Sequence, residues 1–143
     1  MGEIIQIGGL AIKFLISRHE SNGALDMFEF SVAPNAKVPM HHYHRDYDEI
    51  CYGLAGTLTW TSEGVTSTLN PGDAVFIPRG QVHGFENRGD VEAKCLAITT
   101  PGLIGPEYFQ EIAALIAQGG PPDPVRMKEI MLRFGLIPVP PAA

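Results

Sequence analysis

Residues 41–49 read HHYHRDYDE and hold three of the five histidines of the chain. His42 and His44 are two residues apart, so on a β-strand their side chains project from the same face and can share a metal ion. His41 points the other way by the same alternation, so it is expected to face solvent or to form a hydrogen bond rather than to be a fifth ligand. Glu49 lies an odd number of residues beyond His44. We therefore expect the polar residues between them to reverse the chain and bring Glu49 back beside the imidazoles on the adjacent strand.

A second segment, residues 72–87, reads GDAVFIPRGQVHGFEN. An apolar strand is followed by a Pro-Arg-Gly turn, and His83 comes three residues after the glycine of that turn. This spacing predicts that His83 points from a strand into the same cavity as the first two imidazoles. Three imidazoles and the carboxylate of Glu49 form a ligand set for one divalent first-row transition ion, and they leave coordination positions open for a substrate.

Short apolar stretches separated by turn residues continue on both sides of these segments, up to about residue 100. The chain has sixteen glycines and twelve prolines, and the Asn-Pro-Gly-Asp sequence at 70–73 fits a type II turn. Strands of this length and spacing indicate an all-β protein, either a closed barrel or a sandwich. The predicted strands are 12–17, 25–33, 38–44, 49–54, 57–61, 65–69, 74–77, 82–86 and 92–99.

The pattern changes after residue 105. Residues 107–118 carry apolar side chains at the three-and-four spacing of an amphipathic helix. A second helix is predicted from Asp123 at the N-cap, Pro124 at the first helical position and Gly135 at the end. Its apolar side chains should face the barrel or a partner: Val125, Ile130, Met131 and Phe134. The expected role of this tail is packing.

Size and charge narrow the class of protein. The 143 residues suit one compact domain, a barrel over residues 1–104 with a helical extension over 105–143 packed on it. A net charge of −6 without a run of Lys or Arg makes nucleic acid or an anionic membrane a poor partner. The N-terminus resembles neither a signal peptide nor a membrane span, so we expect a cytoplasmic protein. Cys51 and Cys95 should then be free and buried, with a bridge between them as the alternative.

The predicted strand 49–54 is apolar on both faces. Its outer face, with Ile50, Tyr52 and Leu54, should lie under another strand or a partner subunit, and we expect a homodimer on that ground. On the inner face, Cys51 shares the side of Glu49 and is expected to line the cavity or to act as a small buried hydrophobe. Three aromatic residues are expected to wall a substrate pocket or to belong to the core: Trp60, Phe76 and Phe85.

The two segments resemble the two sequence motifs of the cupin superfamily. The first motif, G-x5-HxH-x(3,4)-E-x6-G, is matched within residues 36–56 by His42, His44, Glu49 and Gly56. The second, G-x5-PxG-x2-H-x3-N, is matched at every fixed position by Gly72, Pro78, Gly80, His83 and Asn87. One departure is Ala36, which stands where the first motif begins with glycine. Because that position belongs to a turn, the change affects local loop shape and leaves the ligands untouched.

The resemblance implies a double-stranded β-helix, or jelly-roll barrel, of six or more strands. It implies one divalent transition metal, which can be Fe, Mn, Ni, Cu or Zn, bound through His42, His44, Glu49 and His83. Gly80 and Asn87 would shape the turn and the strand near the last ligand. The two-helix tail is also similar, more weakly, to that of small single-domain cupins described as quercetin-dioxygenase-like.

Cupins include dioxygenases, isomerases, decarboxylases, storage proteins and sensors, so the fold alone leaves several functions open. The leading hypothesis is a metal-dependent dioxygenase-type enzyme for a small organic molecule, in which Glu49 leaves the metal transiently to act as a base. An isomerase or lyase would instead turn over without oxygen and with Zn(II). A non-enzymatic binding module would bind a small ligand saturably and form no product.

Overall fold

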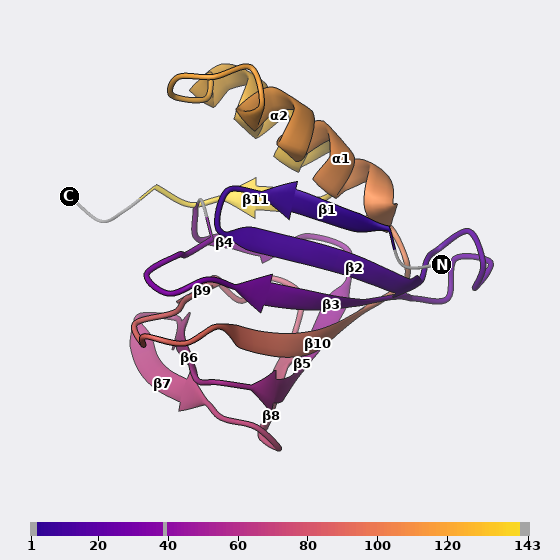
Figure 1. Ribbon diagram of the computed structural model, residues 1–143. Coiled ribbons are helices and arrows are strands. Elements are labelled where there is room, and N and C mark those ends of the chain that lie inside the picture. Colours follow the sequence, from indigo (N-terminus) through magenta and orange to yellow (C-terminus); the bar gives the residue numbers. More distant parts are fainter. Residues whose placement is uncertain (1–2, 39, 141–143) are drawn as a thin grey trace.

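The computed structural model describes residues 3–38 and 40–140. Its strands form two antiparallel sheets that face each other (Figure 1), which confirms the all-β jelly-roll architecture. One sheet has the order β1-β2-β3-β10-β5-β8 and the other the order β11-β4-β9-β6-β7. The strands are β1 (Ile4–Ile7), β2 (Leu10–Ile16), β3 (Asp26–Val32), β4 (His42–His44), β5 (Asp48–Ala55), β6 (Leu58–Ser62), β7 (Val65–Leu69), β8 (Ala74–Ile77), β9 (His83–Glu86), β10 (Ala93–Thr100) and β11 (Leu136–Pro138).

All nine predicted strands form, and β7 and β8 begin and end where the sequence places them. Residue 39 of the predicted strand 38–44 lies outside the described residues. Among the described ones, strand β4 begins only at His42, and before it Lys37 forms an isolated bridge with Glu86. Strands β1 and β11 were not predicted. With four and three residues, they are too short to show a period-two pattern against their surroundings.

The interior of the barrel is filled by large residues beside small ones. On β3, Phe28 and Phe30 point inward and are buried. Their partners across the β3–β10 ladder are Ala97 and Cys95, which are also fully buried. Small side chains next to two phenyl rings let the rings fill the space between the sheets at the density of a protein core. This part of the barrel forms a fixed wall beside the cavity described below.

Two helices, α1 (Gly105–Ile116) and α2 (Pro124–Arg133), pack on each other and cover one side of the barrel (Figure 1). Helix α1 contacts β1 and α2 contacts β11. Because β1 and β11 are the edge strands of the two sheets, the helices bridge the open side between them. No helix in the described part of the chain has the length and apolar character to cross a bilayer.

The second helix follows its sequence signals closely. The Asp123 side chain caps it by accepting a hydrogen bond from the Val125 backbone N–H at 2.9 Å. Gly135 follows its end with a positive φ of 80°, as a C-terminal glycine does. Ile130 and Met131 are buried as predicted, but Val125 is 69% exposed. Val125 therefore does not face the barrel.

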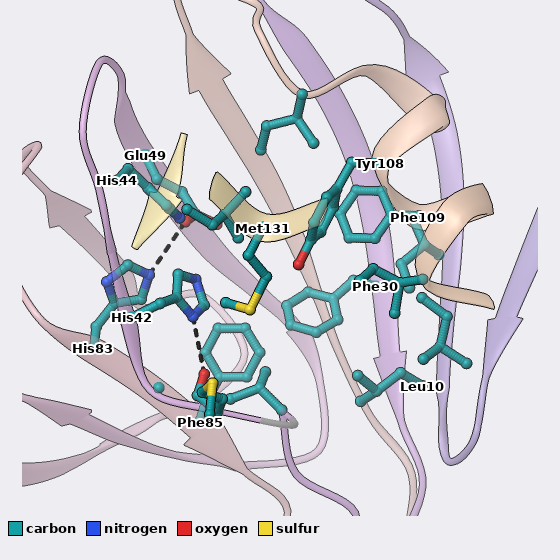
Figure 2. Close-up of a pocket in the computed structure, with 18 of the residues that line it drawn as sticks. Leu10, Phe30, His42, His44, Glu49, His83, Phe85, Tyr108, Phe109 and Met131 are labelled. Atoms are coloured by element: carbon teal, nitrogen blue, oxygen red, sulfur yellow. Dashed lines mark hydrogen bonds and ion pairs between the residues drawn. The ribbon is translucent and has the colours of Figure 1, made fainter. Parts of the chain in front are cut away.

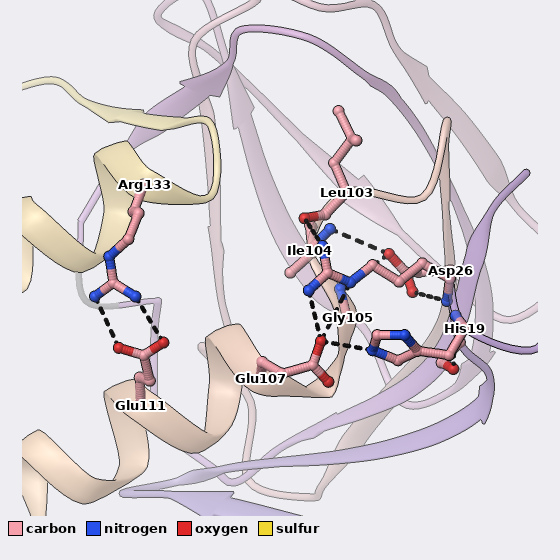
Figure 3. Close-up of polar contacts among 10 residues, drawn as sticks. His19, Asp26, Leu103, Ile104, Gly105, Glu107, Glu111 and Arg133 are labelled. Carbon is pink, nitrogen blue, oxygen red and sulfur yellow. Dashed lines mark hydrogen bonds and ion pairs between the residues drawn. The ribbon is translucent and has the colours of Figure 1, made fainter. Parts of the chain in front are cut away.

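The first helix is capped from a distance. The Ile104 side chain makes no cap, and the buried Asp26 of β3 takes its place (Figure 3). Its Oδ2 accepts hydrogen bonds from the N–H groups of Ile104 and Gly105 at 3.2 and 3.0 Å, and its Oδ1 accepts one from the N–H of Arg18 at 2.6 Å. The bonds from Ile104 and Gly105 satisfy N–H groups that a helix start leaves unpaired, and they fix α1 to the barrel.

Ala36, the departure from the first motif, is accommodated without strain. Its neighbour Asn35 takes the left-handed backbone conformation in this turn, with φ of 65°. Asn87 then ties the turn to the sheet, because its backbone N–H donates to the carbonyl of Ala36 at 2.8 Å and its Nδ2 donates to the carbonyl of Val32 at 3.0 Å. Asn87 is buried, which agrees with its expected structural role.

One aromatic expectation is wrong. Phe76 is 62% exposed on the outer face of β8, so it neither walls a pocket nor belongs to the core of this chain. Ile50, Tyr52 and Leu54 on the outer face of the neighbouring strand β5 are also exposed. No strand from the described residues covers them, which leaves a partner subunit as the remaining interpretation of that apolar face.

Candidate metal centre

The three histidines of the two motifs meet inside the barrel (Figure 2). His42 and His44 lie on β4 and His83 begins β9, and the β4–β9 ladder pairs His42 with His83. Glu49 lies on β5, close to the histidines. Strand β5 belongs to the opposite sheet and does not pair with β4. The polar residues 45–48 therefore carry the chain across the barrel instead of closing a hairpin.

The distances within this cluster suit a single cation. The ligand atoms of His42, His44 and His83 all lie within 4.8 Å of one another, and these residues are called the histidine group below. The Oε1 atom of Glu49 lies 3.6 Å from Nδ1 of His44 and 3.7 Å from Nε2 of His83. The histidine group could therefore hold a metal ion, with a carboxylate at its side.

Backbone carbonyls orient two of the three imidazoles. Nδ1 of His42 lies 3.0 Å from the carbonyl oxygen of Met40, and Nδ1 of His83 lies 2.9 Å from that of Gln81. Each Nδ1 therefore carries the proton and donates it, which leaves Nε2 with a free lone pair. A backbone carbonyl on the far nitrogen is the usual way in which proteins orient a metal-binding histidine.

Aromatic rings hold two of the imidazoles in place. The ring of His83 stacks on Trp60 at a centroid distance of 5.4 Å, and the ring of His44 stacks on the buried Tyr47 at 4.6 Å. Tyr47 is fixed in turn by its hydroxyl, which donates to the carbonyl of Phe134 at 3.1 Å. Trp60 thus belongs to the core behind a candidate ligand, which decides between the two roles expected for it.

One atom in the cluster has an unmet bonding requirement. Nδ1 of His44 is buried and has no hydrogen-bond partner among the described residues. A buried polar nitrogen without a partner is unfavourable, and proteins rarely leave one. A cation held between this nitrogen, the other imidazoles and Glu49 would supply the missing interaction, so the residues present fit a bound metal.

The protonation states also fit. Burial, together with the nearby His83 and His44, lowers the pKa of His42 to about 3. Burial lowers the pKa of His44 to about 4, although Glu49 opposes this shift. Burial works against ionisation of Glu49, but its contacts with His83 and His44 outweigh that effect and lower its pKa to about 2. At neutral pH the imidazoles of His42 and His44 are therefore neutral and Glu49 is ionised, as metal ligands must be.

Cys51 contacts the other oxygen of the Glu49 carboxylate. Its Sγ donates a hydrogen bond to Oε2 of Glu49 at 3.3 Å. The neighbouring Cys95, burial and the Glu49 charge raise the pKa of the Cys51 thiol, so it stays protonated and remains a donor. Both cysteines are free and buried, which confirms the first of the two expectations and not the bridge. The alternation of side chains along the predicted strand placed Cys51 on the same face as Glu49 but gave no indication of this hydrogen bond.

An apolar cavity of about 100 Å³ extends from the histidine group toward α1 (Figure 2). Phe85 and Phe30 line it from the sheets, and Phe85 is thus both a buried residue and a cavity wall. Helices α1 and α2 supply Tyr108, Phe109 and Met131. The helical tail therefore forms part of the cavity, a role beyond the packing expected from its apolar periodicity.

The Cupin domain family matches residues 28–99, half of the chain and a range that includes all four candidate site residues. The chain belongs to the cupin family. The matched range ends before α1, so the helices that line the cavity of this cupin lie outside it.

Two curated proteins illustrate the range of relatives. The cupin is 32% identical over 78 residues to quercetin 2,3-dioxygenase of Bacillus subtilis, covering 54% of this chain and 23% of that protein. It is 36% identical over 76 residues to the tetracenomycin polyketide synthase protein TcmJ of Streptomyces glaucescens, covering 53% and 50%. The chain thus spans half the length or less of these relatives.

Solved structures support the same fold. A predicted oxalate decarboxylase of Thermotoga maritima matches with a TM-score of 0.63 and 25% identity, over 71% of this chain and 92% of that one. The polyketide cyclase RemF of Streptomyces resistomycificus matches with a TM-score of 0.62 and 24% identity, over 69% and 73%. At that identity the second likeness concerns the fold alone.

Proposed function

We propose that this cupin is a metal-dependent, dioxygenase-type enzyme that acts on a small organic molecule. The observation that supports it most is the position of the histidine group and Glu49 at one end of an apolar cavity. The similarity to a quercetin 2,3-dioxygenase agrees with this choice. Ligand pockets are commonly apolar with a few convergent polar groups, as here.

In this proposal His42, His44 and His83 hold one divalent transition ion and Glu49 is the fourth ligand. The bound ion supplies Lewis acidity and redox chemistry. Glu49 has a second role as the base, because an ionised carboxylate beside the cavity can accept a proton from the substrate. Apolar side chains around the cavity exclude water from that proton transfer.

A metal-dependent isomerase or lyase is the second candidate. It would use the same Glu49 carboxylate beside the cavity, because a carboxylate can remove a proton from a carbon next to a carbonyl group without oxygen. A binding module without turnover is the third candidate. It would use the same cavity and need no base at all.

The deciding experiment measures metal content and oxygen uptake. The purified chain should carry close to one transition ion, a His42→Ala/His83→Ala double variant should carry none, and the exposed neighbour variant His41→Ala should match the natural chain. Quercetin, catechol and acetylacetone serve as probes in an oxygen electrode. Glu49→Gln should retain most of the metal through the histidine group but lose turnover by about 100-fold or more.

The other outcomes separate the alternatives. Turnover without oxygen by the zinc-loaded chain would establish the isomerase or lyase class. Saturable binding without product would indicate a binding module. A natural chain that takes up no metal after reconstitution would refute all metal-dependent versions of the proposal.

We also propose a homodimer. The outer faces of the neighbouring strands β5 and β8 expose Ile50, Tyr52, Leu54 and Phe76. A contiguous apolar surface on a small protein is typical of an interaction site, and a second copy of the chain is the partner that the sequence predicts.

A further inference from the structure

Tyr108 on α1 is buried but points its hydroxyl into the cavity (Figure 2). Tyr108 as a whole is only 8% exposed. The ring packs edge-on against Phe109 at a centroid distance of 5.0 Å and against Phe134 at 5.6 Å. These contacts fix the ring, and therefore fix where the hydroxyl lies.

Most of the polar side chains that line the cavity lie at the candidate metal centre, and they are the histidine group and Glu49. Among the described lining residues, Tyr108 is the one other polar side chain on the cavity wall. The described residues offer its hydroxyl no hydrogen-bond partner, and burial alone raises its pKa. The hydroxyl is thus protonated at neutral pH and free to donate.

A purely structural role explains this hydroxyl poorly. A phenylalanine would make the same ring contacts, so the hydroxyl adds nothing to the packing of α1. Unlike Nδ1 of His44, the hydroxyl oxygen is not fully enclosed by the described residues and is accessible from the cavity. The nearby Tyr47 shows the ordinary solution, since its hydroxyl is satisfied by the carbonyl of Phe134. Tyr108 differs because its hydroxyl points into open volume that a ligand can fill.

We propose that the Tyr108 hydroxyl donates a hydrogen bond to an acceptor oxygen or nitrogen of the substrate. The substrate is then a molecule with two polar ends, one facing the histidine group and one accepting from Tyr108, joined by an apolar body that contacts Phe30 and Phe109. The first polar end rests on the proposed metal-dependent function; the contact with Tyr108 does not. Because α1 lies outside the matched Cupin domain, this contact belongs to the present chain and not to the family's barrel.

Two nearly isosteric probes test the donor. Acetophenone carries a carbonyl where ethylbenzene carries a CH2 group, so only the first accepts a hydrogen bond. Both are titrated by NMR into the metal-loaded full chain, into Tyr108→Phe and into the control Tyr52→Phe, whose tyrosine is exposed on the outer face of β5. Tyr108→Phe should weaken acetophenone binding by about 5-fold to 10-fold and leave ethylbenzene within about 2-fold. Tyr52→Phe should change neither.

Three results would overturn the proposal. Unchanged acetophenone affinity in Tyr108→Phe would mean that the hydroxyl does not donate. An equal loss for both probes would mean that Tyr108 acts through packing alone. Failure of the natural chain to bind either probe would mean that the cavity does not accept such a body. The readout is independent of oxygen uptake, so a failed enzyme assay with intact probe selectivity would refute the proposed reaction and not this contact.

Discussion

Both oxygens of the Glu49 carboxylate have defined neighbours. Oε2 accepts from the Cys51 thiol, and Oε1 faces His44 and His83. A carboxylate with one oxygen held in this way keeps the other directed at the position where a cation would bind. Because second contacts of this kind tune metal sites, we expect Cys51 to act as a positioning residue for Glu49.

Cys51→Ala should therefore lower metal affinity by about 10-fold, while the protein stays folded. The matched control is Cys95→Ala, which removes a second buried thiol that makes no hydrogen bond to Glu49. Cys51→Ser keeps a donor at the same place and should restore most of the affinity. Competition titration with a chromogenic chelator measures all three variants. Equal losses in the two alanine variants would show that the thiol acts only through core packing.

Sequence spacing predicted that the histidines of the candidate metal centre would lie together, as they do, but it did not predict the residues that support them. His42, His44 and His83 could be recognised because strand alternation and turn spacing fix their direction within a few residues. The bond between Cys51 and Glu49 depends on side-chain rotamers, which alternation does not determine. Tyr108 was missed for a different reason: it comes from a distant helix, and only tertiary packing brings that helix to the cavity.

At the scale of elements, the position of α1 depends on Asp26. Asp26→Ala would leave three backbone N–H groups without their buried acceptor, so we expect a loss of at least about 2 kcal/mol in the free energy of unfolding. The control, Glu111→Gln, weakens the exposed pair with Arg133 (Figure 3) and should cost less than about 1 kcal/mol. Urea denaturation compares them. A similar small loss in both variants would contradict the capping role of Asp26.

Element prediction succeeded where the turns are specified locally. The turn at 70–73 has its Gly72 at φ of 89° and a 2.9 Å hydrogen bond from the Asp73 N–H to the Asn70 carbonyl, and the strands on both sides of it match the prediction. Prediction failed for β11, whose three residues are a strand only because β4 offers an unpaired edge. No local pattern encodes such a pairing, since its cause is the tertiary packing that brings residues 136–138 beside the free edge of β4.

At the scale of the whole molecule, the proposed dimer can be tested by sedimentation velocity. The natural chain should sediment as a dimer. Phe76→Glu should be monomeric, because a dimer interface on the outer face of β8 would bury the new carboxylate without an opposite charge beside it. Val65→Glu changes an equally exposed apolar residue on β7, in the other sheet, and should stay dimeric. A natural chain that is monomeric at micromolar concentrations would contradict the dimer.

The pairing of β11 with β4 has a consequence for the order of synthesis. Residues 136–138 pair with the strand that carries His42 and His44, with Leu136 opposite His44 and Pro138 opposite His42. During translation the barrel strands leave the ribosome first, and β4 keeps a bare edge until this late segment emerges. A nascent chain stalled before residue 136 would expose the unpaired edge of β4 to other chains. It would also be less able to bind a cation through His42 and His44. Any capture of a cation by the histidine group would then have to wait until residues 136–138 have emerged.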